Sequence, residues 1–383
     1  MLKGNAWLPV YAPFPLTAVS GHGSWLVDEA GREWLDAYGG HAVASTGHCH
    51  PHVVQAIQEQ ASKLIFYSTA VPHPLRETLA DMIAERCPGD LSRVFFCNSG
   101  AEANENALGL ARKATGRRRI VSVEGGWHGR TVACLAVTDG EKYEAGARRA
   151  GMPLSVKVPF NDEAAMRAAV DGTVAAVIVE PVQGVSGARD CSAGFLRAAR
   201  EACDAAGTVL IFDEVQCGVG RSGDFTAAES YGVTPDILTL AKGLASGVPI
   251  GAMVATGALT GGLHPGDLGS TFGGGPLACA AGIATLEVIE RERLMENVKR
   301  VSHRIREWAC GRLGPAGGGV QGLGLLLGLR LPRPAAEVQK TLFARRILTG
   351  TSSDPAVLRL LPPLGFSAEE ADLLLGVLEE VLA

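Results

Sequence analysis

The stretch VLIFDEVQCGVGRSGDFTAAESYGVTPDILTLAKG, residues 209–243, decides the fold. It holds two short apolar runs, 209–213 and 237–241, and each predicts a strand that is buried on both faces. The first run ends at Asp213, and Lys242 follows the second. Because the carboxyl ends of parallel strands meet at one edge of a sheet, we expect both charged side chains to face the same crevice.

The same alternation of apolar runs and helical stretches continues on both sides of this segment. Further strands are predicted at 93–97, 120–123, 174–180 and 252–256, and helices at 101–115, 164–170 and 193–206. This order is typical of an α/β fold in which helices cover both faces of a mostly parallel sheet.

The pattern changes after Gly275. Two long helices are predicted at 277–292 and 294–313, followed by a glycine-rich segment, a strand near 357–361 and a helix at 368–382. We therefore expect a large domain over 51–276. A smaller α+β domain is expected to combine 1–50 with 277–383.

Composition limits the classes of function. Hydrophobic residues make up 47% of the 383 residues, so the chain can bury a large core and is not disordered. The net charge of −5, without long runs of like charge, argues against nucleic-acid or membrane partners and favours small-molecule substrates.

Residues 243–266 carry no charge and could span a bilayer by length alone, but their glycines and prolines favour buried loops and strands. Nine cysteines without a Cys-x-x-Cys pair predict reduced thiols and a cytoplasmic location.

Lys242 is the strongest local signal for chemistry. Desolvation at the end of an apolar strand lowers the pKa of a lysine, and a neutral amine can form a Schiff base. The alternative is a lysine that merely reaches out to solvent. An aspartate opposite such a lysine can keep the pyridine nitrogen of pyridoxal phosphate protonated. Taken alone, Asp213 could equally cap the next turn.

A possible phosphate cradle lies between the strand at 93–97 and the helix that follows it. The residues Asn98-Ser99-Gly100-Ala101-Glu102 place backbone N–H groups, a hydroxyl and a glycine at a helix N-terminus, which is a ready site for a phosphate dianion. Simple helix capping explains the same residues.

Six ordered motifs together resemble the class III, or ω-type, pyridoxal-phosphate aminotransferases. They are NSGAEANE (98–105), WHGRT (127–131), EPVQG (180–184), DEVQCGVGRSG (213–223), AKG (241–243) and STFGG (270–274). The resemblance covers nearly the whole chain, from Tyr11 to RLLPPL at 359–364. Within the class it is greatest to the acetylornithine aminotransferases of arginine biosynthesis. It implies a fold-type-I transferase with a seven-stranded sheet, and a homodimer with sites at the interface.

The resemblance also implies roles for individual residues. The cofactor pyridoxal 5'-phosphate would be bound by Ser99, Gly100, Ala101, Trp127, Glu180, Asp213, Gln216, Lys242 and Thr271. Lys242 would hold the cofactor and move the proton, and Asp213 would pair with its pyridine nitrogen. Trp127 would stack on the ring, and Gln216 would lie near the phenolic oxygen. The phosphate would be met by Gly100 and Ala101, and by the partner subunit's Thr271.

Three residues are implied on the substrate side. Arg130, with Ser270 of the partner subunit, would hold the carboxylate of an N-acylated ornithine, and Arg359 would take a carboxylate of glutamate or 2-oxoglutarate. The family commonly has a glutamate at the position of Val185. In relatives that use unacylated ω-amines this glutamate masks the arginine that matches Arg359. Its absence here favours acylated ornithine over γ-aminobutyrate or free ornithine.

The predicted reaction is transfer of the δ-amino group of N-acetylornithine to 2-oxoglutarate. The alternatives are a related aminotransferase acting on succinyl-ornithine, a carrier-linked lysine precursor or free ornithine, and a non-catalytic α/β binding protein that has kept the fold. The run His48-Cys49-His50-Pro51-His52 has residue types that bind metals, but relatives share a similar turn without metal, so we predict no metal site.

Overall fold

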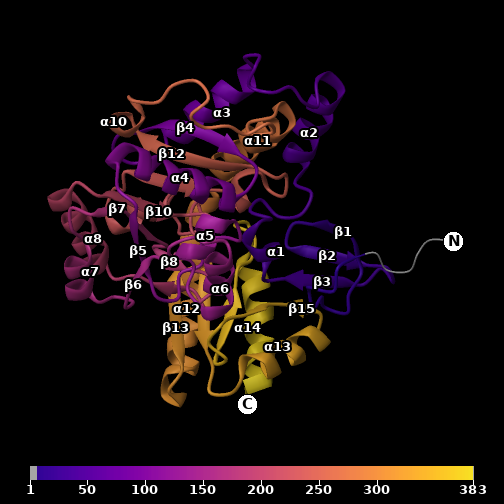
Figure 1. The fold of residues 1–383 in the computed structure, drawn as a ribbon. Helices are drawn as coiled ribbons and strands as arrows, with labels where there is room; N and C mark the ends of the chain where they lie inside the picture. The colour runs from indigo at the N-terminus through magenta and orange to yellow at the C-terminus, as the bar shows by residue number, and fades with distance from the viewer. Residues whose placement is uncertain (1–6, 383) are drawn as a thin grey trace.

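A seven-stranded sheet lies at the centre of the computed structural model, which describes residues 7–382 (Figure 1). In spatial order its strands are β4 (Leu91–Cys97), β12 (Gly251–Thr256), β11 (Ile237–Leu240), β10 (Val209–Asp213), β7 (Val174–Val179), β5 (Arg119–Val123) and β6 (Val156–Val158). β12 runs antiparallel to both its neighbours, and the other neighbouring pairs are parallel. The predicted α/β fold with a mostly parallel sheet is confirmed.

Helices cover the sheet because its central strands are apolar on both faces. Every residue of β7 and of β10 is buried. The connecting helices are α4 (Gly100–Thr115), α5 (Val132–Val137), α6 (Glu141–Arg149), α7 (Glu163–Ala169), α8 (Ala193–Ala206), α9 (Ala227–Tyr231) and α10 (Gly257–Thr260). The strand β6 escapes sequence analysis because its three residues are too few to show a period.

The two ends of the chain share one sheet. β1 (Ala18–His22), β2 (Trp25–Asp28) and β3 (Glu33–Asp36) are joined by β15 (Ile347–Leu348), which pairs in parallel with β3. Figure 1 shows β15 next to β3, with β1–β3 at one side of the C-terminal helices. A further sheet follows the order β13 (Gly319–Leu323), β14 (Leu326–Arg330), β17 (Val357–Leu360) and β16 (Gly350–Thr351).

The remaining helices pack around these sheets. They are the short turn α1 (Gly39–Ala42), α2 (Pro51–Lys63), α3 (Pro74–Ala84), α11 (Pro276–Arg291), α12 (Leu294–Arg312), α13 (Ala335–Ala344), α14 (Ala368–Leu382) and the 3-10 helix η1 (Lys242–Ala245). The uncharged stretch 243–266 forms most of the short helix η1, the buried strand β12 and the short helix α10, with the loops that join them. The prediction of buried loops and strands holds for β12, but it missed the two short helices, and residues 257–266 are partly or fully exposed. Within residues 7–382, no helix combines the length and apolarity needed to cross a membrane.

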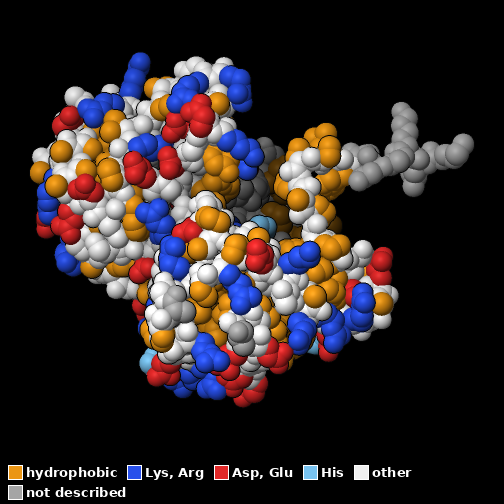
Figure 2. Space-filling model, turned by 90° about the horizontal axis from the view of Figure 1, so that it is seen from below, with side chains coloured by type: hydrophobic (Ala, Val, Ile, Leu, Met, Phe, Trp, Pro, Cys, Tyr) orange, Lys and Arg blue, Asp and Glu red, His pale blue; other side chains and the backbone are white. Residues whose placement is uncertain are grey.

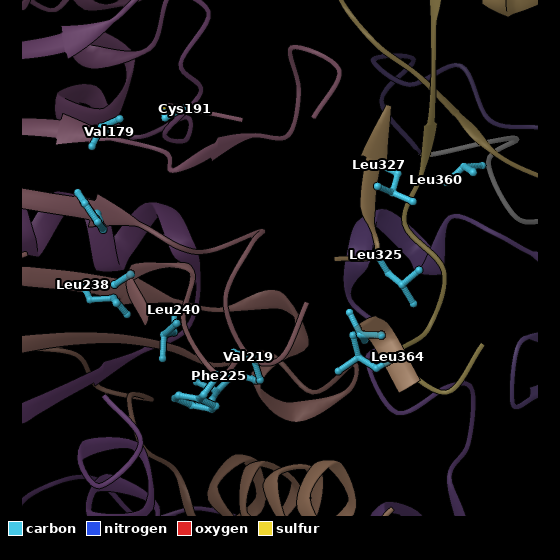
Figure 3. Packing of buried hydrophobic residues seen from close by; sticks show 14 of the residues in the cluster. Val179, Cys191, Val219, Phe225, Leu238, Leu240, Leu325, Leu327, Leu360 and Leu364 are labelled. Atoms are coloured by element: carbon cyan, nitrogen blue, oxygen red, sulfur yellow. The ribbon is translucent and has the colours of Figure 1, made fainter. Parts of the chain in front are cut away.

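One large hydrophobic cluster connects the central sheet with the C-terminal part. Figure 3 shows Leu325, Leu327, Leu360 and Leu364 as one group and Leu240 and Phe225 as another, nearer the strands of the central sheet. All six belong to the same buried cluster. Val219 and Leu364 belong to this cluster, and a side chain on Gly220 would meet the Leu364 Cδ1 atom at 3.2 Å. The core therefore holds the segment that follows β17 against the loop that follows β10.

Candidate active site

A cavity of about 390 Å³ opens where β10 and β11 end and α4 begins. It falls within the size range of small-molecule sites. Among its lining residues are nine that the sequence singled out: Ser99, Gly100, Ala101, Trp127, Arg130, Glu180, Asp213, Gln216 and Lys242. Ser270, Thr271 and Arg359, which were also predicted, are not part of its wall.

Lys242 follows β11 and lies at the wall of the cavity with a left-handed backbone, at φ 44°. Such a conformation is costly for a residue with a side chain and is held only where the surroundings impose it. Burial lowers the pKa of Lys242, against the opposing charges of Asp213 and Glu180. The geometry thus favours a lysine that can give up its proton.

Asp213 belongs to a buried network that the sequence analysis missed in part. Its Oδ2 atom accepts hydrogen bonds from Asn104 Nδ2 at 2.7 Å and from His128 Nδ1 at 2.9 Å. Asn104 Oδ1 in turn accepts from Thr239 Oγ1 at 2.7 Å. Asp213 Oδ1 accepts from the Val215 N–H at 3.1 Å. The network fixes the orientation of the Asp213 carboxylate, and Oδ1 accepts one hydrogen bond where Oδ2 accepts two.

Asn104 and His128 were present in two quoted motifs but were not assigned to the site. For Asn104, the sequence did offer one sign of a site residue: it is a polar residue on the apolar face of α4, where Ala103, Ala107 and Leu108 are buried. His128 is buried as well, at 1% exposure. Only the packing of α4 against the sheet shows that both side chains reach Asp213.

The turn before α4 leaves backbone donors free. Ser99 is the N-cap residue, and its Oγ accepts from the Glu102 N–H at 3.2 Å. Glu102 Oε2 accepts in return from the Asn98 N–H at 2.8 Å. In residues 7–382, no protein acceptor meets the N–H groups of Gly100 and Ala101. These two donors point to an anion at the helix N-terminus.

Gly184 and Gln216 meet at close range. A Cβ atom on Gly184 would stand 1.5 Å from Gln216 Oε1, so only glycine permits this approach. Gln216 Oε1 is buried and has no hydrogen-bond partner among the described residues. Oε1 can accept from a ligand, and the Nε2 amide, for which no hydrogen bond is found within residues 7–382, can donate to one.

Glu180 is held by two backbone donors. Its Oε1 accepts from the Trp127 N–H at 2.7 Å, and its Oε2 accepts from the Gly184 N–H at 3.2 Å. Burial, followed by the negative charge of Asp213, raises the pKa of Glu180 to about 7. The carboxyl group thus links the loop of Trp127 to the loop of Gly184.

Arg359 lies on β17 behind the cavity wall. Its guanidinium donates to Gly184 O at 3.0 Å, to Thr351 O at 2.6 Å and to Tyr38 Oη at 2.7 Å. Val185, the neighbour of Gly184, does line the cavity. Arg359 therefore does not line the cavity itself, but its charge is close enough to help lower the pKa of Lys242.

Ser270 and Thr271 lie in a loop near the helix α4 turn. Ser270 Oγ accepts from Asn98 Nδ2 at 3.2 Å and from the Gly273 N–H at 3.1 Å. Thr271 and its neighbour Phe272 are exposed. In this single chain the loop touches the edge of the phosphate turn, and Thr271 itself stays outside the cavity.

The histidines of residues 48–52 pair with carboxylates rather than with one another. His48 Nε2 lies 2.8 Å from Asp36 Oδ2, and His52 Nε2 lies 2.6 Å from Glu287 Oε2. In residues 7–382, no group of three or more His, Cys, Asp or Glu side chains is arranged to hold a metal ion.

The residues around the cavity fit pyridoxal phosphate. Its aldehyde requires an amine, which Lys242 offers with a lowered pKa, and its phosphate requires donors such as the two free N–H groups of Gly100 and Ala101. Its pyridine nitrogen requires a buried carboxylate, which is Asp213, and its phenolic oxygen requires a polar partner such as the Gln216 amide.

The chain belongs to the class-III aminotransferases, whose family description it matches over residues 9–382. It is thus a transaminase that depends on pyridoxal phosphate. Its similar proteins include acetylornithine aminotransferase 1 of Bordetella bronchiseptica, with 42% identity over 98% of this chain and 96% of the relative. The acetylornithine aminotransferase of Methanocaldococcus jannaschii is 41% identical, over 99% and 96% of the two chains.

Solved structures show the same fold. The ornithine aminotransferase of Toxoplasma gondii superposes with a TM-score of 0.91 at 30% identity, covering 98% of this chain and 92% of the other. The acetylornithine aminotransferase of Elizabethkingia anophelis gives a TM-score of 0.86 at 30% identity, with coverage of 98% and 95%. The predicted fold-type-I transferase architecture and the resemblance to class III are therefore confirmed.

Proposed function

We propose that this protein transfers the δ-amino group of N-acetylornithine to 2-oxoglutarate, giving N-acetylglutamate 5-semialdehyde and glutamate, as a step of arginine biosynthesis. The observation that carries the proposal is the meeting of Lys242 and Asp213 at one cavity, at the ends of neighbouring strands. The choice of amine is supported by relatives at 41–42% identity that are acetylornithine aminotransferases.

Lys242 and Asp213 are the proposed catalytic residues. Bound pyridoxal phosphate supplies an electron sink for the carbon that loses its proton. Lys242 would hold the cofactor through its Nζ atom until the substrate amine takes its place. The freed Nζ would then take a proton from the δ-carbon of the substrate and deliver it to the cofactor C4′ atom. Asp213 would keep the pyridine nitrogen protonated, while Asn104 and His128 orient the carboxylate.

The other cofactor contacts follow the free donors of the cavity. Gly100 and Ala101 would bind the phosphate through their N–H groups, with the Ser99 hydroxyl beside them. Trp127 would cover the ring, with Glu180 holding its loop, and Gln216 would meet the phenolic oxygen.

A homodimer would complete this site. We propose that the partner's Thr271 reaches the phosphate and the partner's Ser270 reaches the substrate. In support, the loop of Phe272 is exposed, and Trp7, Leu8 and Tyr11 are each about 70% exposed. Figure 2 shows hydrophobic side chains gathered where the described chain begins, a feature that marks contact surfaces.

Two arginines would bind the carboxylates of the two substrates. Arg130 lines the cavity, is exposed and lies over the Tyr143 ring at 4.9 Å, so it can grip the single distant carboxylate of N-acetylornithine. Arg359 would bind a carboxylate of 2-oxoglutarate or glutamate. Succinyl-ornithine, a carrier-linked lysine precursor and free ornithine are the competing amines.

We further propose a large domain of residues 51–276 and a small domain that combines 1–50 with 277–383, supported by the pairing of β3 with β15. A cytoplasmic location is supported by nine cysteines that are all free thiols.

The test is the visible absorbance of the purified holoenzyme when N-acetylornithine is added without a keto acid. We expect the cofactor band to disappear and to return with 2-oxoglutarate. A band that responds to free ornithine but not to N-acetylornithine would refute the substrate. Lys242→Ala, which leaves the phosphate turn intact, should lose the covalent attachment and turnover together, and a variant that still turned over would refute the role of the lysine.

A further inference from the structure

The Arg359 guanidinium is surrounded by neutral acceptors. It is 7% exposed, and the three oxygens that it contacts belong to two backbone carbonyls and the Tyr38 hydroxyl. Within residues 7–382, no carboxylate forms an ion pair with it. A guanidinium carries five N–H groups, so one remains on each terminal nitrogen. Those two donors match the two oxygens of one carboxylate.

Tyr38 is held in place by an unusual backbone. The four residues Gly39, Gly40, His41 and Ala42 all have positive φ angles, at 56°, 56°, 67° and 65°. A left-handed turn is unfavourable for the two that carry side chains. Asp36 Oδ1 supports the turn by accepting from the N–H groups of Tyr38 at 2.9 Å and Gly39 at 2.8 Å.

The Tyr38 ring also occupies a fitted slot. A Cβ atom on Gly350 would stand 2.1 Å from Tyr38 Cε2, so the glycine of β16 leaves the space that the ring fills. The Tyr38 hydroxyl lies 2.9 Å from His41 Nδ1 and 2.7 Å from Arg359 Nη2. The Tyr38 ring, the turn of residues 39–42 and the Arg359 guanidinium are thus held together by direct contacts.

The direction of these hydrogen bonds follows from charge. Desolvation, followed by the charges of Arg359 and Lys242, lowers the pKa of His41, which favours the neutral ring. Burial raises the pKa of Tyr38, so its hydroxyl keeps its proton. Since the Tyr38 oxygen accepts from Arg359, its O–H is donated to His41 Nδ1. Tyr38 therefore offers Arg359 an acceptor without charge and leaves the positive charge uncompensated.

We propose that Tyr38 is a specificity-determining residue, which positions Arg359 for the carboxylate next to the reacting carbonyl and thereby favours 2-oxoglutarate over an aldehyde acceptor. The inference rests on the proposed function. It concerns an acceptor that carries a carboxylate on its carbonyl carbon, in contrast to N-acetylglutamate 5-semialdehyde, which carries hydrogen there. A guanidinium fixed in one orientation loses less freedom when the carboxylate binds.

The experiment compares both acceptors on the same aminated holoenzyme. The enzyme is first aminated with glutamate, and the return of the cofactor absorbance is followed after mixing with 2-oxoglutarate or with the semialdehyde. For Tyr38→Phe we expect kcat/KM for 2-oxoglutarate to fall about tenfold, the typical effect of losing one hydrogen bond to a charged group. The value for the semialdehyde should change less than about twofold. Tyr231→Phe is the matched control, since it removes a half-buried hydroxyl outside the cavity wall.

His41→Gly provides a second variant that should fold, because glycine adopts positive φ readily. It removes the acceptor of the Tyr38 proton and should lower kcat/KM for 2-oxoglutarate selectively. Equal losses for both acceptors, or no loss in either variant, would overturn the inference. A wild-type holoenzyme that fails to respond to N-acetylornithine would instead overturn the proposed function, whichever way the variants behave with 2-oxoglutarate.

Discussion

Replacing Gly184 by alanine should disturb the cofactor site without unfolding the protein. The added Cβ atom would lie 1.5 Å from Gln216 Oε1 and 2.4 Å from Gln216 Cδ. Since unbonded heavy atoms prefer about 3.5 Å, the Gln216 amide must move by about 2 Å. Gly184 has no left-handed φ, so alanine fits its backbone. The obstacle is the end of a flexible side chain, and we expect the free energy of unfolding to change by less than about 1 kcal/mol.

The functional effect should be larger than the effect on stability. With the amide displaced, the cofactor loses one hydrogen bond, which corresponds to about 1.4 kcal/mol or a tenfold rise in its Kd. The assay is titration of the apoenzyme with pyridoxal phosphate, followed by the position and amplitude of the visible band. The Tm of the same samples measures stability.

Gly109→Ala is the matched control for this change. Gly109 lies inside α4 with nothing within 4 Å of its Cβ position, so the same substitution should stabilise the helix by about 0.5–1 kcal/mol and leave the band unchanged. If Gly184→Ala bound the cofactor as tightly as Gly109→Ala, with the same absorbance, the steric argument and the role of Gln216 would both be wrong.

Three further predictions concern the network, a buried acid and the substrate. Asn104→Ala removes one of the two side-chain hydrogen bonds to Asp213 Oδ2 and leaves the buried Thr239 hydroxyl without its partner. It should lower the free energy of unfolding by about 2–4 kcal/mol in denaturant titrations, whereas the half-buried Asn106→Ala should have little effect. Burial raises the pKa of Glu214 from 4.5 to about 8, so the folded protein binds this proton more tightly than the unfolded chain and loses stability as pH rises from 4.5 to 8. Glu214→Gln should flatten the fall of Tm over that range, and an unchanged slope would contradict the assignment. Arg130→Ala should raise KM for N-acetylornithine about tenfold or more with a smaller change in kcat, while equal effects on both constants would mean that the arginine acts in the transition state.

The local pattern of the chain determined the layout of the central sheet. Short apolar runs with intervening helices predict strands buried on both faces, because a sheet covered by helices on both sides keeps such runs away from water. The pattern did not reveal that β12 runs antiparallel to its neighbours. The same pattern placed Asp213 and Lys242 at the ends of neighbouring strands, and β10 and β11 do pair in parallel. Strands β13 and β14 were missed, since their leucines and glycines show no clear alternation.

Tertiary structure alone decided which polar groups meet. Asn104 and His128 reach Asp213 from separate elements, and Tyr38 reaches Arg359 from the opposite end of the chain, so no local period reveals either contact. The sequence by itself determined the elements and the residue types at their ends, because backbone propensity and burial act over a few neighbours. The partners of those residues depend on how the elements pack, which is set by contacts far apart in the chain.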